Sequence, residues 1–232
     1  MLLSQFKALS FDCYGTLIDW EAGLLEAFRP ILAAHDVAID EEDLLARYAR
    51  YEAAAEAGPY VTYREILARS LVGVAGEIGF TPDAVEIDGF AGSVVDWPAF
   101  PDSAPALARL AARFRLGVIT NCDDDLFAAS QRRLGVQFDR VVTAQQARAY
   151  KPSARTFELA FERLVLPRER ILHVAQSLFH DHVPAKRFGL TTVWINRRHD
   201  RPGSGATPPA DATPDARFLD MASFADAAVP GG

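Results

Sequence analysis

Side chains with useful chemistry occur at four separate places along the 232-residue chain. Asp12 and Thr16 follow one short apolar run, Asn121 follows another, and Lys151 and Asp181 come later. A carboxylate can attack a carbon atom and form an ester that water then cleaves. An ammonium group and neutral donors can keep such a carboxylate ionised and hold the oxygens of an anionic substrate. These residue types therefore indicate nucleophilic catalysis on a small anion, provided that the fold brings them together.

The order of apolar runs and helical patterns predicts a fold that does so. Apolar runs that end in polar residues predict buried strands. After each run beyond the first comes a segment whose apolar residues have the spacing of a helix. We expect strands at 8–11, 116–120, 140–143, 171–174 and 191–195, and helices at 104–114, 125–134, 154–164, 184–188 and 219–227. Such alternation is typical of an α/β protein with a parallel sheet between two layers of helices. Ligands bind at the carboxyl ends of the strands in such sheets, where the candidate residues lie.

A long helical segment interrupts this alternation after the first strand. Apolar residues recur at helical spacing from Trp20 to about 95, without a convincing strand among them. We expect residues 1–17 and 97–232 to form the core and residues 18–96 to form a helical insert. An insert in this place would close over the site, exclude water and supply an apolar wall for the substrate.

Composition excludes several classes of function. The net charge of −7 and the pI near 5.2 argue against a nucleic-acid partner, since phosphates repel an acidic surface. No long apolar run predicts a membrane span, and the first residues do not resemble a secretion signal. The two cysteines, Cys13 and Cys122, suit a reducing compartment, so we expect a cytoplasmic protein.

Four segments resemble the motifs of the haloacid dehalogenase (HAD) superfamily, in the same order. They are Phe11–Leu17, Ile119–Asn121, Tyr150–Pro152 and Val174–Leu190. The resemblance implies a Rossmann-like core with a helical cap. It also implies that Asp12 is the nucleophile, that Lys151 keeps it ionised and that Thr16 positions it. Asp181 would orient Lys151 or the hydrolytic water.

The same resemblance suggests which side chains bind the substrate. Arg47 on the expected cap resembles the arginine that contacts the departing halide in type II 2-haloacid dehalogenases. The other candidates are polar or aromatic residues near the strand ends or the seam between cap and core: Tyr14, Trp20, Thr120, Asn121 and Ser177. The implied partner is a small carboxylate, and a homodimer formed through the cap stays open.

Two departures separate this chain from the phosphatases of the superfamily. Phosphatases have a second Asp two residues after the nucleophile, where this chain has Tyr14. They also have a Mg²⁺-binding acid early in the last motif, where this chain has Gln176. Because Mg²⁺ prefers anionic oxygen ligands, both changes favour the metal-independent branch, which needs no cofactor. That branch displaces a leaving group from C2 of a small carboxylic acid.

The sequence leaves several functions open within and beyond this branch. The leading hypothesis is a 2-haloacid dehalogenase, although Phe157 and Leu178 stand where those enzymes have tyrosine and asparagine. Several sequence segments, such as Phe11–Glu21, instead resemble those of an azetidine-2-carboxylate hydrolase, which opens a strained ring at C2. A HAD phosphatase and a non-catalytic HAD-like binding protein are further alternatives.

Overall fold

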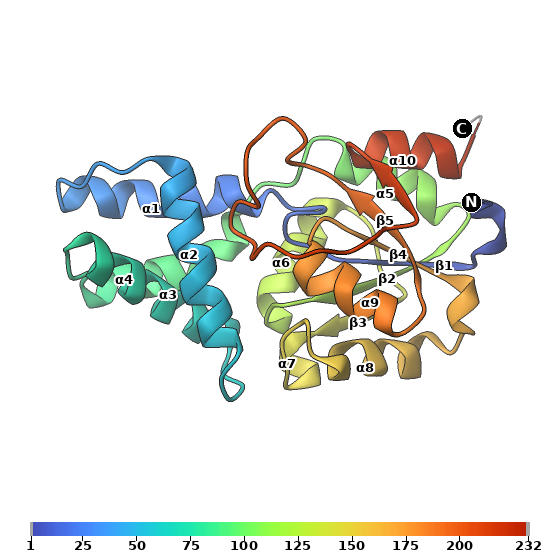
Figure 1. Ribbon diagram of the computed structural model, residues 1–232, viewed down its shortest axis with the longest axis horizontal. Coiled ribbons are helices and arrows are strands. Elements are labelled where there is room, and N and C mark those ends of the chain that lie inside the picture. Colours follow the sequence, from blue (N-terminus) through green and yellow to red (C-terminus); the bar gives the residue numbers. More distant parts are fainter. Residues whose placement is uncertain (1, 231–232) are drawn as a thin grey trace.

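The computed structural model describes residues 2–230, and its core is one parallel sheet of six strands (Figure 1). The strand order is β3-β2-β1-β4-β5-β6. The strands are β1 (Ala8–Phe11), β2 (Arg115–Thr120), β3 (Arg140–Thr143), β4 (Ile171–Ala175), β5 (Thr191–Ile195) and β6 (Ala216–Phe218). This arrangement confirms the predicted α/β fold with a Rossmann-like parallel sheet.

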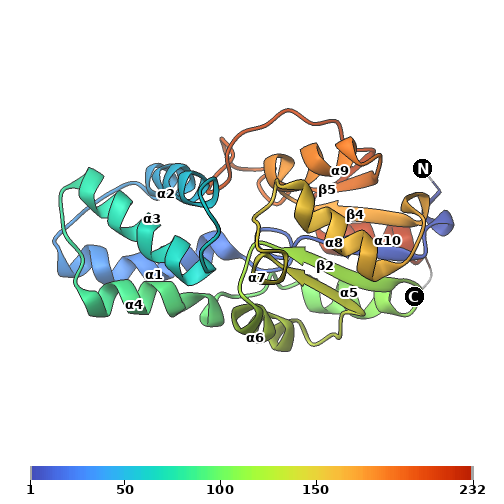
Figure 2. The same cartoon turned by 90° about the horizontal axis from the view of Figure 1, so that it is seen from below.

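Helices cover both faces of the sheet because its strands are apolar on both sides. Leu9 and Phe11 of β1 join the larger buried cluster, whereas Ala8 joins the smaller one on the opposite face. The larger cluster includes residues of α5 (Ser103–Ala111), α6 (Asp124–Leu134) and α10 (Met221–Ala228). The smaller includes residues of α7 (Ala144–Ala147), α8 (Ala154–Leu164) and α9 (Val183–Arg187). Figure 2 shows α8 and α9 on the side of the sheet away from α5 and α6.

Between β1 and α5 the chain forms a separate helical lobe, on the left in Figure 1. Its helices are α1 (Trp20–Ala34), α2 (Glu41–Glu56), α3 (Tyr63–Ile78) and α4 (Ala84–Gly92), followed by a 3₁₀ turn at Ser93–Asp96. Aromatic rings join three of them, because Phe28 lies 4.5 Å from Phe90 and 6.3 Å from Tyr48 between ring centroids. These rings belong to the larger buried cluster, which therefore continues from the sheet domain into the lobe.

The sequence did not predict β6, the last strand. Residues 216–218 pair in parallel with β5 at the edge of the sheet, and none of the three is fully buried. A strand of three half-exposed residues carries too little apolar pattern to be recognised. The helix after it begins at Met221, because the Asp220 side chain accepts the Ser223 N–H at 2.7 Å and caps its first turn.

Among the contacts that join the helical lobe to the sheet domain are two made by residues that follow strand ends. Asp123, after β2, accepts the backbone N–H groups of Tyr63 and Arg64 at 3.0 and 3.2 Å, at the start of α3. Arg198, after β5, forms ion pairs with Glu21 of α1 and Glu42 of α2. Both contacts are made by core residues that follow strand ends, and they fix the lobe above that edge of the sheet.

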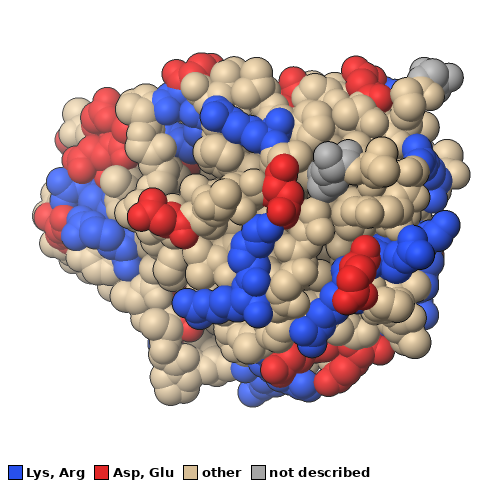
Figure 3. Space-filling model, turned by 45° about the vertical axis from the view of Figure 1, so that its right-hand side comes forward, with Lys and Arg blue, Asp and Glu red and all other residues tan. Residues whose placement is uncertain are grey.

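The surface carries charge of both signs. On the face shown in Figure 3, basic and acidic side chains lie beside one another. Among the residues that the structure describes, no helix is both long and apolar enough to cross a membrane.

Candidate active site

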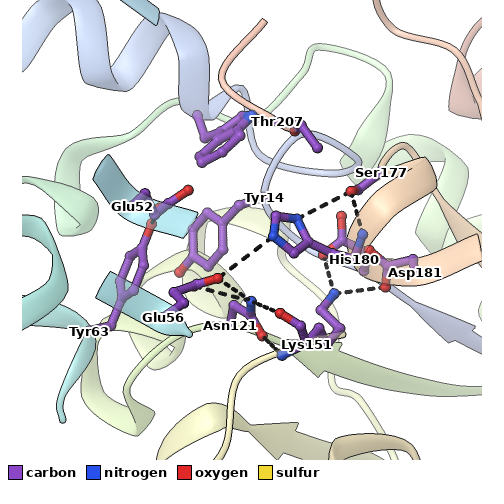
Figure 4. Close-up of a pocket in the computed structure, with 12 residues that line it drawn as sticks. Tyr14, Glu52, Glu56, Tyr63, Asn121, Lys151, Ser177, His180, Asp181 and Thr207 are labelled. Atoms are coloured by element: carbon purple, nitrogen blue, oxygen red, sulfur yellow. Dashed lines mark hydrogen bonds and ion pairs between the residues drawn. The ribbon is translucent and has the colours of Figure 1, made fainter. Parts of the chain in front are cut away.

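A pocket lies between the helical lobe and the carboxyl edge of the sheet (Figure 4). Its empty volume, which includes the opening to solvent, is about 380 Å³. The sheet domain supplies Asp12, Tyr14, Asn121, Lys151, Ser177, His180 and Asp181. The lobe supplies Trp20, Glu52, Glu56 and Tyr63, and the loop after β5 supplies Thr207.

Lys151 connects the two carboxylates of the sheet domain. Its Nζ donates to Asp12 Oδ1 at 2.8 Å, to Asp181 Oδ1 at 2.7 Å and to the Ile119 carbonyl at 3.0 Å. Burial would lower the pKa of Lys151, but the two adjacent carboxylates raise it above its usual value. The lysine therefore stays charged in a place where only 2% of it is exposed.

Asp12 is held at both of its oxygens. Thr16 Oγ1 donates to Asp12 Oδ2 at 2.6 Å and itself accepts the Gln176 N–H at 2.9 Å. Burial raises the pKa of Asp12 above its ordinary value, against the opposing effect of the Lys151 charge. The turn between Asp12 and Thr16 uses Gly15 at φ 89°, a left-handed conformation that favours glycine. The resulting carboxylate has a fixed orientation.

Asp181 is held from behind by a buried chain of hydrogen bonds. His173 Nε2 lies 3.0 Å from Asp181 Oδ1, and His173 Nδ1 lies 3.0 Å from Ser10 Oγ. Burial would raise the pKa of Asp181, but Lys151 and His173 lower it overall, so the group stays ionised. Asp181 Oδ2 has no hydrogen-bond partner within residues 2–230. Sequence reasoning did not find His173, which looks like an ordinary strand residue of β4.

Asn121 positions the backbone of Lys151. Its amide oxygen accepts the Lys151 N–H at 2.7 Å, and its Nδ2 donates to the Lys151 carbonyl at 3.2 Å. The same Nδ2 also donates to both carboxylate oxygens of Glu56 at 3.2 Å. Asn121 therefore links the sheet domain to the wall of the pocket that the lobe supplies.

Most of the residues singled out from the sequence line this pocket, and three do not. Those that line it are Asp12, Tyr14, Trp20, Asn121, Lys151, Ser177 and Asp181. Thr16 does not line it but contacts Asp12. Thr120 is 1% exposed but does not line the pocket.

Arg47 also lies away from the pocket lining. Its guanidinium pairs with Asp43 and Glu77 on the outer surface of the lobe. The physical reason is the position of each residue around the helix. Tyr48, Glu52 and Glu56 are four residues apart and lie on one face of α2, whereas Arg47 lies off that face. This placement argues against the anion-binding role that the sequence suggested for Arg47.

The two glutamates of α2 are functional candidates that sequence reasoning missed. Glu52 Oε1 accepts hydrogen bonds from the hydroxyls of Tyr48 and Tyr63, both at 2.8 Å. Burial raises the pKa of Glu52 to about 7, and burial also raises that of Glu56 well above its usual value. The sequence pattern that could have revealed them is an acidic residue on the apolar face of an amphipathic helix, where charged residues are rare. Thr207 lies in an irregular loop and had no such signal.

The pocket does not offer the donor set of a divalent cation. Within residues 2–230, no group of three His, Cys, Asp or Glu side chains is placed to hold a metal ion. Lys151 Nζ lies between Asp12 and Asp181, where a cation would otherwise share their charge. Gln176 contributes its backbone N–H to Thr16 and its carbonyl to Trp194 Nε1. The residues therefore fit an ammonium-bridged pair of carboxylates.

The family is shown by comparison with known proteins. Residues 6–181 match the model of the haloacid dehalogenase-like hydrolases. The match covers most of the chain, which belongs to this family and is a hydrolase. An (S)-2-haloacid dehalogenase of Pseudomonas putida is 25% identical over 91% of this chain and 92% of that protein. Haloacetate dehalogenase H-2 of Moraxella sp. (strain B) is 26% identical over 84% of this chain and 88% of that protein.

Solved structures share the fold. A defluorinating L-2-haloacid dehalogenase has a TM-score of 0.79 at 23% identity and covers 96% of this chain and 94% of its own. The L-2-haloacid dehalogenase of Xanthobacter autotrophicus with chloropropionic acid covalently bound has a TM-score of 0.80 at 20% identity. That comparison covers 98% of this chain and 100% of the other.

Proposed function

We propose that this protein is a metal-independent 2-haloacid dehalogenase, which displaces a halide from C2 of a small carboxylic acid. The observation that carries the proposal is the placement of Asp12, whose two oxygens are held by Lys151 and Thr16 at one end of a small pocket. A carboxylate in a fixed orientation, paired with a buried cation, is suited to nucleophilic attack.

The proposed reaction has two steps. In the first step, a lone pair of Asp12 forms a bond to C2, and the C2–halogen bond breaks with its electron pair leaving as halide. In the second step, water adds to the carbonyl carbon of the ester and the bond from that carbon to the oxygen of C2 breaks. One proton of the water goes to the departing 2-hydroxy acid and the other to solvent, which regenerates the Asp12 carboxylate. Lys151 supplies the positive charge, Asp181 and Asn121 position Lys151, and Ser177 supplies a neutral donor for the substrate carboxylate.

The relatives support this substrate class. Those reported above are named for 2-haloacids or haloacetate, and the Xanthobacter structure has chloropropionic acid covalently bound. Azetidine-2-carboxylate hydrolysis is not favoured by these relatives. Phosphatase chemistry lacks support in the pocket, since Tyr14 cannot serve as the second acid.

The helical lobe, residues 18–96, is proposed to act as a cap over the core, which residues 1–17 and 97–232 form. Trp20 and Tyr63 of this lobe give the pocket aromatic walls that exclude water. The buried thiols of Cys13 and Cys122 support a cytoplasmic location for the protein. The proposal includes a homodimer with its contact on the cap.

The direct test measures chloride release from L-2-chloropropionate in the presence of EDTA. The wild-type protein should release chloride, whereas Asp12→Asn should release none above background. Dependence on Mg²⁺, or faster turnover of p-nitrophenyl phosphate than of the chloroacid, would reject the proposal.

A further inference from the structure

The wall of the pocket that the lobe supplies is acidic. Four carboxyl groups line the pocket, namely Asp12, Asp181, Glu52 and Glu56, and Lys151 is the one ammonium group among the described lining residues. An anionic substrate adds another negative charge. Since unpaired charges in a dry site are costly, all four carboxyl groups cannot remain ionised beside such a substrate. Asp12 and Asp181 are paired with Lys151, so the two glutamates are the groups that must be neutral.

The surroundings of Glu52 determine where its proton lies. Both tyrosine hydroxyls, from Tyr48 and Tyr63, donate to Oε1. Tyr48 is fully buried and Tyr63 is 2% exposed, so these bonds are protected from water. The oxygen that stays available for a proton is therefore Oε2, and Figure 4 shows the second Glu52 oxygen directed away from Tyr63.

We infer that Glu52 is a specificity-determining residue, a neutral carboxyl whose O–H donates a hydrogen bond to the halide as it leaves C2. The inference rests on the proposed function. Asp12 supplies the electron pair for the new O–C2 bond, the electron pair of the C2–halogen bond leaves with the halide, and the proton stays on Glu52. The cap carboxyl thus does what a cationic cap residue would do, and Arg47 is turned outward and does not line the pocket.

The neighbouring groups are consistent with a neutral Glu52. Glu56 lies one turn further along α2, accepts from Asn121 and has its pKa raised by burial. His180 has its pKa lowered to about 4 by burial, and its Nε2 lies 3.6 Å from Glu56 Oε2 without a hydrogen-bond partner in the described chain. Burial raises the pKa of both Tyr48 and Tyr63 well above its ordinary value, so they stay donors. Their hydrogen bonds lower the pKa of Glu52, but burial raises it by more. Across the pocket lie the paired charges of Asp12, Lys151 and Asp181.

Two substitutions of Glu52 test the inference. Glu52→Ala removes the donor and should lower kcat for chloride release from L-2-chloropropionate about 100-fold, the usual effect of losing one aimed donor. Glu52→Gln keeps an N–H donor and an acceptor for the tyrosines, so its kcat should stay within about tenfold of wild type. Glu65→Gln, an exposed cap glutamate, is the matched control and should be unchanged. Circular dichroism and melting temperature show whether each variant folds.

The pH profile gives a second readout, which a merely structural role would not move. Wild-type kcat/KM should fall as pH rises through about 7, because Glu52 then loses its proton. Glu52→Gln cannot ionise at this position and should lack that alkaline limb. A limb that persists unchanged in Glu52→Gln would overturn the inference.

The remaining outcomes separate this inference from the proposed function. A folded Glu52→Ala that releases chloride at the wild-type rate would overturn the inference alone. A Glu52→Gln variant as slow as Glu52→Ala, together with wild-type preference for 2-chloro-4-aminobutanoate over L-2-chloropropionate, would mean that an ionised Glu52 binds an ammonium group. Absence of chloride release by the wild-type protein would overturn both proposals.

Discussion

Lys151 Nζ lies 2.8 Å from Asp12 Oδ1, and these side chains come from loops 139 residues apart in the chain. The two residues are 2% and 5% exposed, so water screens this ion pair little. Asp181 shares the same ammonium group at 2.7 Å. Removing Lys151 leaves two buried carboxylates without their shared partner, which links its catalytic role to stability.

Asp12→Asn should abolish turnover while the fold persists, since an amide is a poor nucleophile and is close in size to a carboxylate. A single-turnover reaction in H₂¹⁸O gives the sharper readout for the wild-type protein. Ester hydrolysis places the label in the Asp12 peptide on the first turnover, as measured by mass spectrometry. Label found first in the 2-hydroxy acid would show direct attack by water and remove Asp12 from the nucleophilic role.

Lys151→Met should reduce kcat by about 100-fold or more, because the pocket then has no positive charge for the substrate carboxylate. It should also destabilise the protein by about 3–5 kcal/mol, since two buried carboxylates lose their shared partner. Urea unfolding measures the second effect. Lys186→Met is the matched control, because Lys186 pairs with Asp215 on the surface, and it should change neither quantity strongly. Comparable activity in both variants would contradict the role of Lys151.

Dialysis against EDTA should leave chloride release and melting temperature unchanged. The reason is that Lys151 occupies the position between Asp12 and Asp181 where a divalent ion would neutralise charge. Differential scanning calorimetry with and without Mg²⁺ checks the stability part. A clear rise in melting temperature with Mg²⁺ would show that Asp181 or another carboxylate is a ligand.

Glu52 should make stability depend on pH in a definite direction. Its pKa in the folded protein is about 7, above the ordinary 4.5, so its contribution is fully present below pH 4.5 and is lost as pH rises through about 7. Glu52→Gln removes this loss. The free energy of unfolding of Glu52→Gln, relative to wild type, should therefore increase between these pH values, by about 3 kcal/mol at most. Urea unfolding at a series of pH values measures it, and a constant difference would contradict the pKa shift.

Arg198→Ala should destabilise the contact between the helical lobe and the sheet domain. Arg198 is 7% exposed and pairs with Glu21 and Glu42, so its removal leaves Glu21 buried without its main partner, at a cost of about 3–5 kcal/mol. Arg201→Ala is the control, because Arg201 is largely exposed and lies 3.8 Å from Glu21. Hydrogen exchange of α1 and α2 should speed up in Arg198→Ala only. Equal exchange in both variants would show that the Arg198 ion pairs do not hold the lobe.

The amino-acid sequence alone was enough to predict five of the six strands and the helices α5, α6, α8, α9 and α10. The apolar runs that became β1, β2, β3, β4 and β5 are continuous and end in polar residues, and this local pattern depends only on burial of neighbouring side chains. The same local pattern predicted the site residues Asp12, Lys151 and Asp181, because each lies in the segment that follows a strand. The order of strands in the sheet then makes their convergence a geometric consequence.

Only the tertiary structure decided which face of α2 meets the pocket. Helical spacing shows that Tyr48, Glu52 and Glu56 share a face and that Arg47 does not, but a helix of the lobe can turn that face toward its own core or toward the site. The packing of α2 against α3, where Tyr63 bonds to Glu52, and the closure by Arg198 fix that rotation. Burial then raises the pKa of Glu52, because removal from water disfavours the charged form. Residues distant in sequence create that burial, so local sequence pattern could not reveal it.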